Sequence, residues 1–99
     1  MIENRSDIRI AGVKLTASSS REGERGLLGW VSFELNQILR IDGVVLRRTS
    51  RGSLSLSFPE RRDRRGQCHQ IVRPLSNRTR MEIEDQVFQA LRLGEAVPR

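Results

Sequence analysis

The amino-acid sequence predicts an α+β fold, in which a mostly antiparallel four- to five-stranded sheet carries one C-terminal helix packed on it. Two observations predict this fold. As far as residue 73, apolar side chains recur mainly at every second position, which is the period of a strand with one buried face. Beyond residue 74 they recur with a period of about 3.6, which is the period of a helix.

The length and composition indicate one small domain. The chain has 99 residues, too few for two domains with separate cores, and 36% of them are apolar. We expect residues 1–6 to be a flexible N-terminus, residues 7–94 to be the single domain and residues 95–99 to be a flexible tail. With this apolar content the hydrophobic core will be small for the length of the chain, which favours an oligomer.

Five segments have the composition and alternation of strands: residues 7–15, 27–35, 38–48, 53–58 and 68–73. Gly12 and the Asp42-Gly43 pair interrupt the first and third of these segments, and we expect a β-bulge at Gly12 and a bulge or bend at Asp42-Gly43. Polar, charged or glycine-bearing segments separate the strands and are expected to be loops or turns: residues 18–26, 36–37, 49–52 and 60–67.

The helix is predicted from an apolar stripe near the C-terminus. Its members are Ile83, Val87, Ala90 and Leu91, flanked by Met81 and Phe88. Thr79 to Glu82 has the pattern of a capping box, with Ser76 and Asn77 as alternative N-caps, and Gly94 is the expected left-handed stop. One helix covers one face of a sheet, so Leu28 and Trp30, expected on the other face, suggest pairing with a second copy as a homodimer.

Cysteine usage and the reactive side chains argue against an enzyme. Cys68 is the one cysteine, which excludes an internal disulfide and favours a reducing compartment such as the cytoplasm. Cys68 and His69 are neighbours on a presumed strand, so their side chains should point to opposite faces, with Cys68 buried and His69 at the surface. We expect no catalytic residues, no metal and no cofactor. Neither a signal peptide nor an apolar run of membrane-spanning length is present in the sequence, so we expect a soluble protein.

Charge is the strongest functional signal. The net charge is +6, and all of the excess lies in residues 40–80, which hold eleven arginines and three acids. This distribution is typical of an anion-binding face, although a solvated surface is the alternative. Arginine supplies all but one of the basic residues, which favours bidentate phosphate binding, but codon bias in a GC-rich genome would give the same ratio.

Arg78 and Arg80 fall in the first turn of the expected helix, where the helix dipole disfavours cations. A phosphate bound at the helix N-terminus would compensate, and pairing with nearby acids is the alternative. We take the aromatic residues, Trp30, Phe33, Phe58 and Phe88, to be core rather than stacking platforms for single strands. The candidate nucleic-acid-binding residues are Arg47, Arg48, Arg51, Arg61, Arg62, Arg64, Arg65, Arg73, Arg78 and Arg80.

An ordered set of short segments resembles the SpoVG family of septation and stage V sporulation regulators. The segments are Ile41-Asp42-Gly43, Arg51-Gly52, Leu54, Leu56, Phe58-Pro59-Glu60-Arg61-Arg62, Ile71-Val72-Arg73-Pro74-Leu75, Thr79-Arg80, Ile83, Asp85 and Val87. The resemblance covers residues 8–93 and is that of a distant member: residues 18–26 form a longer loop than is usual, and Gln70 and Arg73 replace a common acid and a common histidine.

The resemblance implies a cytoplasmic bacterial homodimer that binds DNA, or RNA, to regulate gene expression, with the helix and nearby basic residues as the binding surface. Double-stranded DNA is the first expected ligand. The alternative is an adaptor that docks an acidic protein through the same basic face; neither a membrane nor a small-molecule substrate is expected as a partner.

Overall fold

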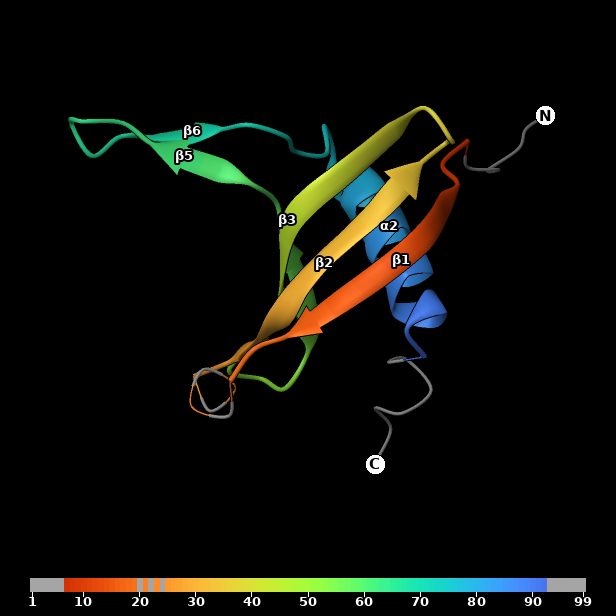
Figure 1. Ribbon diagram of the computed structural model, residues 1–99, viewed down its shortest axis with the longest axis horizontal. Helices are drawn as coiled ribbons and strands as arrows, with labels where there is room; N and C mark the ends of the chain where they lie inside the picture. Colours follow the sequence, from red (N-terminus) through yellow and green to blue (C-terminus); the bar gives the residue numbers. More distant parts are fainter. Residues whose placement is uncertain (1–6, 20, 22, 24, 93–99) are drawn as a thin grey trace.

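The computed structural model describes residues 7–19, 21, 23 and 25–92. Strands β1 (Ile10–Ala17), β2 (Leu27–Leu35), β3 (Leu39–Arg48) and β4 (Leu54–Ser57) form an antiparallel sheet in that spatial order. Strands β5 (Glu60–Arg62) and β6 (Cys68–Gln70) form a separate two-stranded ribbon. Helix α2 (Asn77–Ala90) packs on one face of the four-stranded sheet, behind it in Figure 1, and the predicted α+β fold is confirmed.

The core lies between this sheet and α2, where the alternating residues of β2, β3 and β4 meet the helical stripe. Its buried members are Val31, Phe33, Ile41, Val44, Leu46, Leu56, Ile83 and Val87. Leu91 and Phe88 pack against this cluster, whereas Met81 is 55% exposed. Ile83, Val87 and Leu91 of the predicted stripe are therefore confirmed, whereas Ala90 is exposed and the flanking Met81 lies outside the core.

Both predicted bulges are confirmed. In β1 the register with β2 shifts between Ala11 and Lys14, and Gly12 has a φ of 58°. In β3 the register with β2 shifts opposite Ser32, next to Gly43, whose φ is 75°. Glycine adopts such positive φ angles without a steric penalty, so these two positions absorb the irregularity that bends the strands.

Three expectations are wrong. Residues 60–67 form β5 and a tight turn rather than a charged loop, and residues 68–70 pair with β5 instead of adding a fifth strand to the main sheet. The third error concerns Cys68, which is exposed because β6 lies outside the core. The N-cap of the helix is one of the alternatives expected above: it is Ser76, whose Oγ accepts a hydrogen bond from the Thr79 N–H at 3.1 Å.

Some expectations fall outside the described residues. These are the flexible termini, residues 1–6 and 95–99, and the stop at Gly94. The loop at residues 18–26 is only partly described. Within the described part of the chain, the helix ends at Ala90, and Arg92 takes the left-handed conformation with a φ of 61°.

Side chains of α2 hydrogen-bond the backbone of both edge strands. On the β1 side, the Gln86 carboxamide accepts from the Ile10 N–H at 2.9 Å and donates to the Ile8 carbonyl at 2.8 Å. On the β4 side, Glu84 accepts from the Leu56 N–H at 3.0 Å, and Arg80 donates to the Leu56 carbonyl at 3.0 Å. At each of these points the helix occupies the backbone groups to which another strand would pair.

Candidate functional site

The β5–β6 ribbon, here called the arm, projects away from the sheet (Figure 1). Its strand pairs are Glu60 with Gln70, Arg61 with His69 and Arg62 with Cys68. Since paired residues share a face, Cys68 and His69 lie on opposite faces of the arm, as expected from their adjacency. Arg64 and Arg65 lie in the turn, so the arm carries four arginines in a segment of five residues.

Asp63 organises the turn of the arm. Its Oδ1 accepts from the N–H groups of Arg65 and Gln67, both at 2.9 Å, and its Oδ2 lies 2.7 Å from Nε2 of His69. The hydrogen bond with His69 and then that with Gln67 lower the pKa of Asp63 below its ordinary value. The carboxylate in the turn therefore holds the backbone and His69, and it neutralises none of the four arginines.

The arginine side chains of the arm are left without acidic partners in the part of the chain that the structure describes. Arg62 donates from Nη1 to the Gly66 carbonyl at 2.8 Å, which holds it against the turn but leaves its charge uncompensated. Arg61, Arg64 and Arg65 are exposed. This arrangement concentrates positive charge on a narrow element that solvent surrounds.

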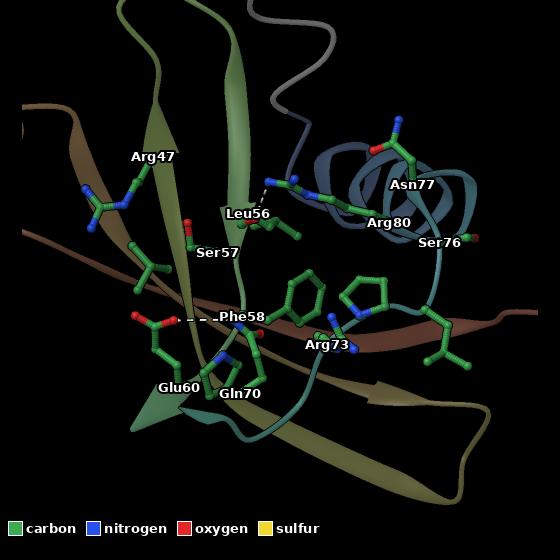
Figure 2. Close-up of a pocket in the computed structure, with 15 residues that line it drawn as sticks. Arg47, Leu56, Ser57, Phe58, Glu60, Gln70, Arg73, Ser76, Asn77 and Arg80 are labelled. Atoms are coloured by element: carbon green, nitrogen blue, oxygen red, sulfur yellow. Dashed lines mark hydrogen bonds between the residues drawn. The ribbon is translucent and has the colours of Figure 1, made fainter. Parts of the chain in front are cut away.

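A second basic feature is a groove of about 750 Å³ beside β4 (Figure 2). The end of β4, the segment before α2 and the first turn of α2 line it. Three of the candidate arginines contribute to it, Arg47, Arg73 and Arg80, and Glu60 is its acid. Figure 2 shows Arg47 on the β3 side of β4 and Arg80 on the α2 side.

The groove arginines differ in how they are held. Arg80 donates to Ser55 Oγ and to the Leu56 carbonyl, and its Nε lies 3.3 Å from Oε2 of Glu84. Its cation near the helix N-terminus is thus compensated within the protein and requires no bound anion. Arg47 and Arg73 are exposed and have no hydrogen-bond or ionic partner among the described residues, so their guanidinium groups are available to a ligand.

The ten candidate arginines do not form a single face. Four lie on the arm, three in the groove, and Arg48 and Arg51 at the β3–β4 turn, the opposite end of the sheet from the arm (Figure 1). Arg48 donates from Nη1 to the Gly52 carbonyl at 3.1 Å. Arg78 is exposed in the first turn of α2, which contains no acid.

Two expectations were made for Trp30, and they have different outcomes. It lies on β2 opposite Thr16 of β1 and Val45 of β3, on the face that α2 does not cover, as expected, but it is 37% exposed, so the expectation that it belongs to the core is wrong. Leu28, expected beside it, packs against the core instead. The sequence contained the signal, because Trp30 is out of phase with Val31 and Phe33, and one helix covers one face.

No protein-family model and no curated protein matches this chain. The resemblance to the SpoVG-like regulators therefore stays a prediction. In the described part of the chain, no group of three or more histidine, cysteine or acidic residues is arranged to hold a metal ion. None of the helices described there combines the length and apolar character needed to cross a membrane.

Proposed function

We propose that this chain is a non-enzymatic nucleic-acid-binding protein that regulates gene expression, as the resemblance to SpoVG-like regulators implies. The observation that supports this proposal is the arm: a projecting two-stranded ribbon with four arginines, whose turn carboxylate is engaged by Arg65, Gln67 and His69. A two-stranded ribbon fits the major groove of duplex DNA, and arginine binds phosphate bidentately.

The groove adds a second contact region. Arg47 and Arg73 have no partners in the described structure, so phosphates can bind there without breaking an existing ion pair. Arg80 lines the groove, but it is paired with Glu84 and hydrogen-bonded to β4, which makes it a positioning residue. In this proposal the arm and the groove bind backbone phosphates, and these contacts carry affinity rather than sequence preference.

Salt dependence of binding tests the arm. The double variant R64A/R65A removes two charges from the turn, and R9A/R25A removes two exposed charges outside the candidate set as the matched control. Fluorescence anisotropy with labelled duplex DNA should show that R64A/R65A lowers the slope of log affinity against log salt by about 1.8, because each lost phosphate contact contributes about 0.9. An unchanged slope, or an equal change in the control, would refute the role of the arm.

A pull-down experiment distinguishes this proposal from the adaptor alternative. When the purified protein is used as bait in a lysate treated with nuclease, it should no longer retain bound material, because the partner is a polynucleotide. An acidic protein that remains bound after nuclease treatment would favour the adaptor. The homodimer is part of the proposal, and sedimentation velocity measures it directly.

A further inference from the structure

The sheet face opposite α2 combines an exposed aromatic ring with hydroxyl and basic side chains. Strand register assigns residues to this open face, because directly paired residues in antiparallel strands point to the same side. The face carries Lys14, Thr16, Trp30, Ser32, Glu34, Arg40, Val45, Arg47, Ser55 and Ser57. Figure 1 is viewed from this side, and no other described element covers β1 and β2 there.

We infer that this open face binds a single-stranded stretch of nucleic acid, with one base stacked on Trp30. The inference rests on the proposed function and adds a site for unpaired nucleotides to the duplex contacts proposed for the arm. In a duplex the bases are stacked on one another, so a ring fixed on a sheet surface can stack only on a base that has left the helix.

The packing of the core does not require Trp30. It lies on β2, a central strand, yet it is 37% exposed, whereas its neighbour Val31 on the helix side is 1% exposed. The core closes without Trp30, because Val31 and Phe33 fill the β2 side of the contact with α2. A large aromatic side chain on an open sheet is the arrangement that stacks bases in many single-strand-binding proteins.

The charges around Trp30 complement a polyanion. Lys14 and Arg47 lie on the same face and have no acidic partner among the described residues. Arg40 is bound to Glu34 at 3.3 Å and also donates to Ser32 at 3.1 Å, so that pair is internally neutral. The open face therefore presents net positive charge next to the ring.

A second copy of the chain fits this face less well. Its large apolar side chains are Trp30 and Val45, and the remaining members are hydroxyl-bearing or charged. A stable interface buries about 800 Å² on each partner, with an apolar centre. Two copies packed through this face would also place one net positive surface against another.

The open face continues into the groove. Val45, Arg47 and Ser57 belong to both, and Arg73 stands on the far side of the groove. Trp30 pairs with Val45, so Arg47 is its diagonal neighbour, at a typical backbone separation of about 7–8 Å. A base on Trp30 and a phosphate on Arg47 can thus belong to one short stretch of strand.

The intrinsic fluorescence of Trp30 can test the inference, because Trp30 is the only tryptophan in the chain. Titration with an oligothymidylate of roughly 15 nucleotides should quench its fluorescence, and a duplex of the same length should not. W30A should bind the oligothymidylate about 5- to 150-fold more weakly, the range that corresponds to the loss of one stacked base, while W30F keeps most of the affinity. M81A removes an exposed apolar side chain from α2 and should bind like the unaltered protein.

Several outcomes would overturn the inference. Unchanged fluorescence on binding, equal quenching by the duplex, or equal affinity of W30A and the unaltered protein each would do so. Tryptophan fluorescence that changes with protein concentration alone, together with a dimer in sedimentation that W30A abolishes, would show that a second copy covers the face. If W30A binds normally while R64A/R65A weakens binding, the inference fails and the proposed function stands; if no polynucleotide binds, both fail.

Discussion

Replacement of Glu84 by alanine should weaken the attachment of β4 to α2. In the structure Oε2 of Glu84 accepts the Leu56 N–H at 3.0 Å and lies 3.3 Å from Nε of Arg80. A hydrogen bond to a charged group contributes about 1.5–3 kcal/mol, and a half-exposed helical ion pair adds about 0.3–0.5 kcal/mol. Because β4 is an edge strand, water can reach the released N–H. We therefore expect E84A to lower the free energy of unfolding by about 2 kcal/mol, near the lower end of that sum.

Urea denaturation measures this loss of unfolding free energy, and two further variants show which interaction causes it. E84Q keeps an oxygen that accepts from Leu56 but removes the ion pair, so it should cost about 1 kcal/mol or less. D85A removes an exposed carboxylate on the same helix for which the described structure shows no partner, and it should change stability by no more than about 0.5 kcal/mol. The reasoning is wrong if E84A loses less than D85A, or if E84Q is as unstable as E84A.

Three other predictions test separate parts of the fold. G29A should cost about 1–3 kcal/mol in urea denaturation, because a Cβ there would collide with the Thr16 carbonyl oxygen of β1; wild-type stability would contradict it. S76A should cost about 1 kcal/mol and lower Tm by about 4–8 °C through loss of the N-cap, and an unchanged Tm would show that another residue caps α2. The pKa of Asp63 is lowered by folding, so its stabilisation of the turn should be full above the ordinary value of 3.8 and vanish as the pH falls through the lowered pKa. The chemical shift of the Gln67 amide should follow this loss as the pH falls. D63N should remove the pH dependence of that shift.

Local pattern was sufficient for most of the fold. The two-residue period located β2 at its observed bounds, and the glycines at residues 12 and 43 marked both bulges, because these features depend on neighbouring residues alone. The arm was missed for the opposite reason. Its strands are short and charged, and Asp63 stabilises its turn through side-chain contacts. The pattern of apolar residues does not predict such contacts.

The candidate site was harder to predict, because the availability of a side chain depends on contacts between distant segments. The sequence marks Arg80 and Arg73 equally as cations, yet Arg80 binds β4, 24 residues away, and Arg73 has no described partner. For Trp30 the two-residue period gave the correct face, opposite Val31 and Phe33, but the assignment of its ring to the core is wrong because α2 covers the other face.

The arm leaves and rejoins the body of the protein at nearly the same point. The Ile71 N–H donates to the Pro59 carbonyl at 3.0 Å, so the segment between them closes like a loop on the end of β4. None of the residues from Pro59 to Ile71 belongs to the hydrophobic cluster. We therefore expect changes in the length, sequence or charge of the arm to leave the sheet and helix that carry it intact.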